Sequence, residues 1–149
     1  MYNLNMKILV FLHGTAIMRK NGSSVLDYAN YVPVGNAVEK LKNWQSQGAE
    51  ILYLSSHENK EDVEKDELVL ERYDFPEGQI YWRQNGKTYA QITEEIMPDV
   101  LIEDDCESIG GEKEMTYTNI KPELKSKIKQ IVVKEFHGID DLSDDIDKL

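Results

Sequence analysis

The sequence predicts an α/β fold, a single domain built as a three-layer α/β/α sandwich around a mainly parallel sheet. Short apolar runs rich in β-branched residues alternate along the chain with segments whose apolar residues recur at helical spacing. No internal repeat, low-complexity segment or linker interrupts this pattern, and the length of 149 residues fits one compact domain over residues 1–149. Because such alternation places helices on both faces of a parallel sheet, we expect a Rossmann-like arrangement.

The N-terminal part predicts a strand, a flap and a helix. The run Ile8–Leu12 is apolar throughout, as expected for a buried central strand. Residues 16–32 break the pattern, and with a turn at Asn21–Gly22 they predict an irregular excursion or short hairpin, a candidate small flap. Apolar residues at helical spacing predict a helix over 37–47, which ends at Gly48.

The middle of the chain continues the alternation. Residues 51–54 predict the next strand, and Asn59 followed by an acidic first turn predicts the start of a second helix. Residues 80–82 predict a short strand. A short helix over 89–96 follows and ends at Pro98.

The C-terminal third predicts two further strands, over Val100–Ile102 and 131–133. Between them, Pro122 suits the first turn of a helix. The acidic tail, residues 138–149, is expected to be loosely held.

Composition and charge exclude several partners and settings. Apolar residues make up 40% and charged residues 30% of the chain, and the formal charge is −11. Such a surface repels phosphate backbones and anionic lipid, so we expect no nucleic acid and no membrane as partner. No apolar run approaches the roughly 20 residues of a membrane span, and no secretory signal is recognised. A single cysteine, Cys106, forms no intrachain disulfide, which predicts a cytoplasmic protein.

Polar groups follow three of the predicted strands. Gly14–Thr15 follows the first strand, Ser55–Ser56 the second and Glu103–Asp104–Asp105 the strand at 100–102. Because ligands of parallel sheets bind outside this edge, we expect one shared crevice. The acids Glu103, Asp104 and Asp105 either hold Mg²⁺, the usual cation for oxygen ligands, or form a solvated turn. The serine hydroxyls either hold a phosphate oxygen or only cap a helix.

His13 is the candidate catalytic residue at this edge. A lone histidine is commonly a packing or surface residue. Alternatively, its imidazole lies near Asp104 and Asp105, where it binds a transition metal, acts as a base or accepts a phosphoryl group. If His57 joins it, two imidazoles with two carboxylates suit Zn²⁺ or Mn²⁺ better than Mg²⁺.

The order and spacing of these motifs resemble the haloacid dehalogenase-like (HAD-like) phosphohydrolases without a large cap. The resemblance implies that Asp104 and its acidic neighbours hold Mg²⁺, and that Gly14–Thr15 and Ser55 contact a phosphate. It also implies a cation ahead of the acidic strand. Lys87 stands in that place, and Arg83, which can bind phosphate through two parallel hydrogen bonds, competes for the role.

Two positions depart from that family. Its first motif reads Asp-x-Asp-Gly-Thr, but Phe11 and His13 stand at the two Asp positions, and no acidic residue precedes Asp27. An aspartyl phosphohydrolase attacks phosphorus with a carboxylate, whereas a phenyl ring cannot attack, ligate Mg²⁺ or take a proton. We therefore expect a relative without the usual nucleophile, and whether it is an enzyme stays open.

Three functions follow from these expectations. The first is a non-catalytic or strongly altered HAD-like relative that binds a phosphorylated small molecule, a divalent cation or both. The second is a divergent metal-dependent phosphohydrolase of the phosphatase or nucleotidase type, in which Asp104, Asp105 and His13 hold metal-bound water. The third is an acidic module that binds a basic protein. A receiver domain is set aside, because no phosphate-accepting Asp stands at a middle strand.

Overall fold

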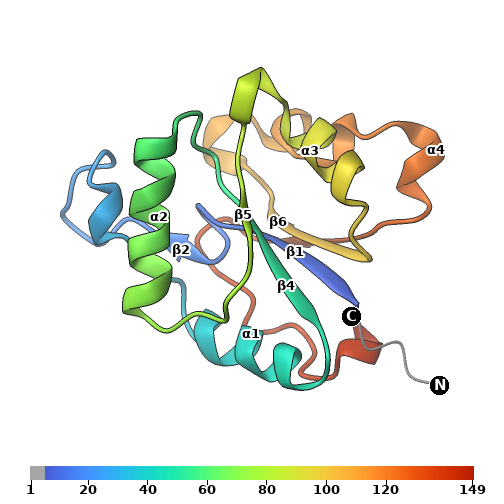
Figure 1. Cartoon of the computed structure of the whole chain (residues 1–149), viewed down its shortest axis with the longest axis horizontal. Coiled ribbons are helices and arrows are strands. Elements are labelled where there is room, and N and C mark those ends of the chain that lie inside the picture. The colour runs from blue at the N-terminus through green and yellow to red at the C-terminus, as the bar shows by residue number, and fades with distance from the viewer. Residues whose placement is uncertain (1–5) are drawn as a thin grey trace.

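The computed structural model describes residues 6–149 and is built around a five-stranded, wholly parallel sheet (Figure 1). The strands stand in the order β5-β4-β1-β6-β7. Their bounds are β1 Lys7–Phe11, β4 Glu50–Leu54, β5 Ile80–Tyr81, β6 Val100–Asp104 and β7 Lys129–Val133. A separate antiparallel pair, β2 Ile17–Met18 and β3 Val32–Pro33, spans the flap predicted over residues 16–32 and extends one residue beyond it. The predicted α/β class is confirmed.

Helices connect the strands and cover both faces of the sheet. The α-helices of the described residues are α1 Ala37–Ser46, α2 Lys60–Arg72, α3 Tyr89–Ile96 and α4 Pro122–Lys125. Short 3₁₀ turns lie at Tyr28–Asn30, Gln84–Gly86, Glu107–Ile109, Gly111–Glu114, Tyr117–Asn119 and Ile146–Lys148. Within residues 6–149, no helix combines the length and apolar character that crossing a membrane requires.

Alternate residues of β1 face opposite sides of the sheet, which creates two cores. Ile8 and Val10 face the larger core, where Trp44 of α1 is fully buried. Leu9 and Phe11 face the smaller core, to which α3 contributes its apolar side. The sheet is therefore enclosed between two helical layers, as a three-layer sandwich requires.

The central position of β1 brings three strand ends together. Phe11 pairs with Leu54 of β4, and β6 flanks β1 on the other side in parallel register. The segments that carry His13, Ser55 and Asp104 therefore start at the same edge of the sheet. This edge is the one where the sequence predicts a crevice.

The acidic tail is held against α1 rather than loosely attached. Ile139 and Ile146 are buried in the larger core. The indole N–H of Trp44 donates to the carbonyl oxygen of Ser143 at 2.9 Å, and Nζ of Lys40 lies 2.6 Å from a carboxylate oxygen of Asp144. Burial of two isoleucine side chains stabilises this docking, and acidic composition alone did not reveal it.

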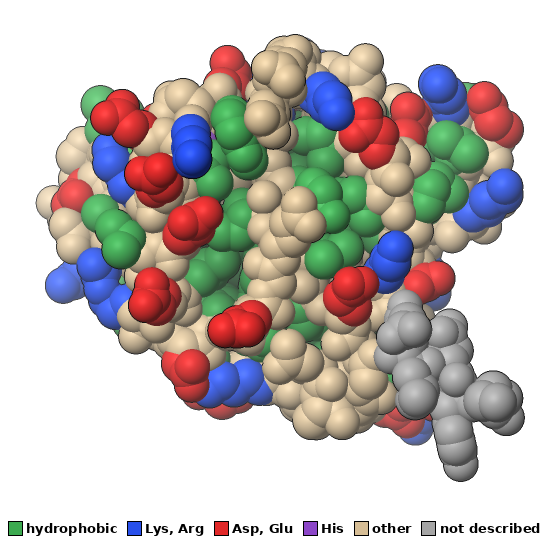
Figure 2. Space-filling view, viewed as in Figure 1, with side chains coloured by type: hydrophobic (Ala, Val, Ile, Leu, Met, Phe, Trp, Pro, Cys, Tyr) green, Lys and Arg blue, Asp and Glu red, His purple; other side chains and the backbone are tan. Residues whose placement is uncertain are grey.

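The negative charge is spread over the face of the molecule that Figure 2 shows. On the face drawn in Figure 2, red Asp and Glu side chains lie among blue Lys and Arg side chains and do not gather in one patch. A diffuse negative charge slows the approach of large polyanions, but it does not determine which ligand a single site binds.

Candidate functional site

A cavity of about 430 Å³ opens at the carboxyl-terminal edge of the sheet. Its walls come from the end of β1, the flap, the end of β6 and the loop after β7. The lining residues that matter for its chemistry are Phe11, His13, Ser56, Asp104, Glu135 and Phe136.

His13 connects this cavity to a buried carboxylate on α2. Its Nε2 lies 2.9 Å from Oδ1 of Asp66, and its Nδ1 shares a hydrogen bond with Oγ of Ser56. Because an ionised carboxylate only accepts, Nε2–H of the metal-free ring donates to Asp66, while the direction of the bond to Ser56 depends on the protonation of Nδ1. The carboxylate beside this imidazole is therefore Asp66, and not Asp104 or Asp105 as in one of the two alternatives that the sequence left open.

Asp66 is fully buried and gathers further polar groups around it. Oγ of Ser55 donates to its Oδ2 at 2.6 Å, and Nε2 of His57 lies 3.5 Å from its Oδ1. Burial by itself raises the pKa of a carboxyl group, but His13, His57 and Ser55 outweigh burial and lower the pKa of Asp66 to about 2. Asp66 is therefore ionised at neutral pH.

Three other carboxylates form an acid cluster, of which Asp104 and Glu135 line the cavity. Asp104 ends β6, Asp105 follows it, and Glu135 follows β7. One carboxylate oxygen from each lies within 4.8 Å of the others. Asp104 accepts hydrogen bonds from Oγ1 of Thr15 and from the backbone N–H of Cys106, both at 2.9 Å.

The electrostatics of the acid cluster favour a cation. Burial raises the pKa of Asp104, and the negative charge of Glu135 raises it further. The hydrogen bonds that Asp104 accepts lower this pKa but do not outweigh the other two effects. Among residues 6–149, the acid cluster forms no ion pair with a lysine or arginine. Residues 6–149 thus contain two groups of side chains close enough to hold a metal ion, one around Asp66 and this one.

Glu103, a predicted metal ligand, does not join the acid cluster. Its Oε1 accepts from the backbone N–H of Thr116 at 2.7 Å, and its Oε2 accepts from that of Tyr117 at 3.0 Å. The side-chain amide of Gln130 also donates to Oε2 at 3.2 Å. Glu135, which sequence reasoning missed, stands beside the two aspartates instead.

Gly14 and Thr15 press the end of β1 against the acid cluster. Gly14 has φ of +93°, and a Cβ there would lie 2.9 Å from Oδ2 of Asp104. The buried hydroxyl of Thr15 donates to the same oxygen. Both residues therefore position Asp104, while contact with a phosphate stays a prediction.

The two predicted phosphate-binding cations line a neighbouring hollow and not this cavity. Nε of Arg83 donates to the carbonyl oxygen of Ser56 at 3.2 Å, and its guanidinium pairs with Glu58 at 3.1 Å. Nζ of Lys87 pairs with Glu95 at 3.0 Å. Each cation already has an acidic partner, and a ligand-binding role for either stays a prediction.

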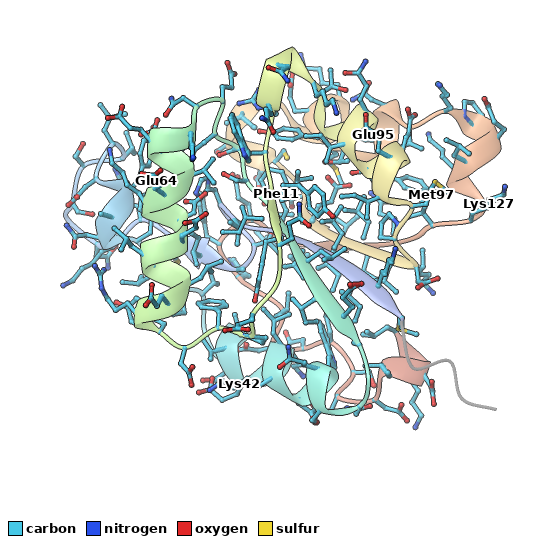
Figure 3. The ribbon with its side chains drawn as sticks, in the orientation of Figure 1. Phe11, Lys42, Glu64, Glu95, Met97 and Lys127 are labelled. Atoms are coloured by element: carbon cyan, nitrogen blue, oxygen red, sulfur yellow. The ribbon has the colours of Figure 1, made fainter. Side chains whose placement is uncertain are left out.

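Phe11, at the expected nucleophile position, belongs to the smaller core and reaches the cavity wall. Its ring packs edge-on against Tyr89 of α3, with 5.1 Å between ring centroids. Figure 3 shows Phe11 inside the molecule. The ring supplies an apolar wall and no reacting group.

Two site residues, Asp66 and Glu135, escaped the sequence analysis although each left a signal. Asp66 stands on the inner face of α2 at helical spacing from Val63 and Val69, where an apolar residue is the norm. Glu135 follows the last strand, and the rule that strand ends share one edge applies to it as well.

Comparisons with known proteins identify the fold and no family. No protein-family model and no curated protein matches the chain. One similar solved structure is a chain of the Pnkp1/Rnl/Hen1 complex, with a TM-score of 0.62 and 16% identity over 90% of this chain. Another is from the Pnkp1/Rnl/Hen1 RNA repair complex, with a TM-score of 0.60 and 18% identity over 86% of this chain. The matches cover 48% and 43% of those chains, so the present chain spans about half their length.

These comparisons correct the expectations that rested on the HAD-like resemblance. The family assignment was wrong, because no family model matches and the similar solved chains belong to an RNA repair complex. The functions drawn from it, a phosphate-binding pseudoenzyme or a divergent phosphatase, are withdrawn, as is the acidic protein-binding module. The physical reason is that a short sequence motif can agree with a family in residue type while its side chains make different contacts. Ser55 matches in type, but its hydroxyl donates to Asp66, and Lys87 pairs with Glu95.

The exclusion of nucleic acid as a partner is also corrected by the RNA repair neighbours. That exclusion used the formal charge of the whole chain, −11. Net charge governs long-range attraction, whereas a binding site depends on the groups and ions at one place.

Proposed function

We propose that the chain is a module of an RNA-processing assembly that holds the end of a single RNA strand in the cavity. A Mg²⁺ ion bound by Asp104, Asp105 and Glu135 would join the RNA to the protein. The observation that carries this proposal is the acid cluster at the sheet edge, two of whose members, Asp104 and Glu135, line the cavity. The likeness to chains of an RNA repair complex supports RNA as the ligand.

The donor set of the acid cluster fits a hard cation. All three side chains offer carboxylate oxygens, the ligands that Mg²⁺ prefers, and the ion commonly keeps coordination positions for phosphate oxygens. Thr15 and the backbone of Cys106 hold the Asp104 carboxylate in place. A bound divalent cation would offset the local negative charge that otherwise repels a phosphate.

The shape and lining of the cavity suit a single strand. A volume of about 430 Å³ is in the range of pockets that hold small-molecule-sized groups, which suits a terminal nucleotide and not a duplex. Phe136 lines the cavity and is 48% exposed, and Tyr31 and Tyr89 contribute further aromatic surface. Bases stack on exposed aromatic rings without regard to sequence. Arg19, also in the lining, offers a cation for the backbone.

The test is fluorescence anisotropy with short single-stranded RNA, with and without a terminal phosphate, in Mg²⁺ or in EDTA. We expect binding that requires Mg²⁺ and weakens by roughly tenfold or more in Asp105→Asn/Glu135→Gln, because charge-assisted contacts are lost. Glu64→Gln/Glu67→Gln is the matched control, since it removes the same charge from exposed positions of α2. RNA binding that is equal in Mg²⁺ and EDTA, or equal in the two double variants, would contradict the proposal.

A further inference from the structure

A second group of potential metal ligands lies behind the cavity wall and differs in chemistry from the acid cluster. His13 follows β1, His57 follows β4, and Asp66 comes from α2. Their candidate ligand atoms all lie within 4.8 Å of one another, and the two imidazole ring centroids are 4.6 Å apart. The end of β1 and the neighbouring segment from β4 to α2 thus bring two nitrogens and one oxygen close together.

Two of the three separations between these atoms are close to those in a metal coordination shell. Nε2 of His13 lies 2.9 Å and Nε2 of His57 lies 3.5 Å from Oδ1 of Asp66. In a tetrahedral zinc site with bonds of 2.0–2.1 Å, neighbouring ligand atoms stand about 3.3–3.4 Å apart. The two observed distances lie on either side of that value, so small side-chain shifts would complete the geometry.

The position of His57 is a second observation that points to a ligand here. The residue is 7% exposed, and its Nε2 is buried with no hydrogen-bond partner among residues 6–149. A buried polar atom without a partner carries a cost of about 1–3 kcal/mol. Because this nitrogen is directed at the Asp66 carboxylate from beyond good hydrogen-bond distance, a cation between them would satisfy both.

The hydrogen bonds around the group orient it as metal ligands are oriented. Metal-binding imidazoles commonly use their other nitrogen in a hydrogen bond, and Nδ1 of His13 bonds to Ser56. With a metal on Nε2, the neutral ring carries its proton on Nδ1 and donates to the Ser56 hydroxyl, so metal binding replaces the Nε2–H bond to Asp66. Ligating carboxylates are themselves hydrogen-bonded, and Oδ2 of Asp66 accepts from Ser55 at 2.6 Å, which leaves Oδ1 toward the histidines. Tyr28 of the flap packs over both imidazoles, with centroids 6.4 Å from His13 and 4.3 Å from His57.

We propose that His13, His57 and Asp66 form a zinc site with three protein ligands and one open coordination position. Imidazole nitrogens with one carboxylate are a borderline donor set that selects Zn²⁺ over the Mg²⁺ that all-oxygen clusters bind. His13 also lines the cavity, so the open position lies close to the proposed RNA site. The zinc site stands without the proposed function, because none of its ligands belongs to the acid cluster.

The test is Zn²⁺ titration of the chelator-treated full chain in competition with a chromophoric chelator, together with Co²⁺ absorption spectra. Asp105→Asn/Glu135→Gln serves as the background, because it removes the other metal-binding group. We expect one Zn²⁺ per chain and the visible absorption of four-coordinate Co²⁺. His57→Gln in the same background abolishes the Co²⁺ bands and weakens Zn²⁺ binding by more than roughly a hundredfold. Loss of a residue that only hydrogen-bonds to a ligand typically weakens metal binding by about 10- to 100-fold, and loss of a ligand itself should weaken it more.

The matched control is His137→Gln, which removes the chain's third histidine from an exposed position. This variant keeps the zinc stoichiometry and the spectrum if the proposal holds. Circular dichroism of each metal-free variant separates loss of a ligand from loss of folding. Zinc binding that survives His57→Gln would overturn the site. The proposal would also be overturned if the chain bound no zinc and a fluorophosphonate labelled Ser56. That result would identify Ser56, His13 and Asp66 as a hydrogen-bonded Ser-His-Asp triad.

Discussion

His13 at the end of β1 and Asp66 on α2 are joined by a 2.9 Å contact between Nε2 and Oδ1, across 53 positions of sequence. The contact is largely buried, and it connects the central strand to a helix that covers the sheet edge. Ser55 and His57 reach the same carboxylate from the end of β4. Asp66 is thus the point through which two strand ends and one helix are held in register.

Replacement of Asp66 by alanine should destabilise the metal-free chain by about 3 kcal/mol, because it leaves buried partners without their carboxylate. Urea unfolding in EDTA, followed by far-ultraviolet circular dichroism, measures this change. Glu67→Ala, next along α2 and exposed, should stay within about 0.5 kcal/mol of the parent. Equal stability of the two variants would contradict the role given to Asp66.

The stability of the metal-free chain should depend on pH through Asp66. Folding lowers the pKa of Asp66 from its ordinary 3.8 to about 2, so the folded state binds this proton less readily than the unfolded state. The stabilisation is therefore fully present above about pH 5 and is lost as the pH falls toward 2. The measurement is urea unfolding of the parent chain and of Asp66→Ala at several pH values between 5 and 2. We expect the difference in unfolding free energy between the two proteins to decrease as the pH falls. A difference that stays constant would show that Asp66 does not titrate as stated.

Cys106 should resist alkylation in the folded chain at pH 8. Burial and the negative charges of Asp104 and Glu103 raise the pKa of its thiol to about 12, and the thiolate is the reactive form. Iodoacetamide labelling followed by mass spectrometry should be slow in native buffer and rapid in urea. Asp104→Asn removes one of the charges and should increase the native rate. Rapid labelling of the native parent chain would contradict the burial of this thiol.

Gly14→Ala should destabilise the chain more than Gly22→Ala. Both glycines have positive φ, of +93° and +81°, so both substitutions force an L residue into the left-handed region. Only at Gly14 would the added Cβ meet another atom, Oδ2 of Asp104 at 2.9 Å, while Gly22 has open space. We expect the difference in unfolding free energy to be about 1–3 kcal/mol, the range for overpacking. Thermal unfolding of the two variants side by side measures it.

The sheet and the position of its ligand-binding edge could be predicted because their signals are local. The apolar run at Ile8–Leu12 marks the central strand without reference to any partner, and the helix expected over 89–96 has those bounds in the structure. Asp104 ends β6 and Asp105 follows it, so reasoning from strand ends led to the acid cluster. The tail was the exception, because Ile139 and Ile146 find their place only against α1.

The sequence by itself determined an α/β domain whose strand ends share one polar edge. Two signals carried this prediction, the periodicity of strands and helices and the position of polar groups after strands. Both are properties of short segments. Only the tertiary structure decided which side chains meet there. Asp66, and not Asp104, faces His13, and Glu135 takes the place expected for Glu103. A hydrogen bond depends on distances of a few ångströms between atoms far apart in sequence, and those distances exist only once the helices have packed on the sheet.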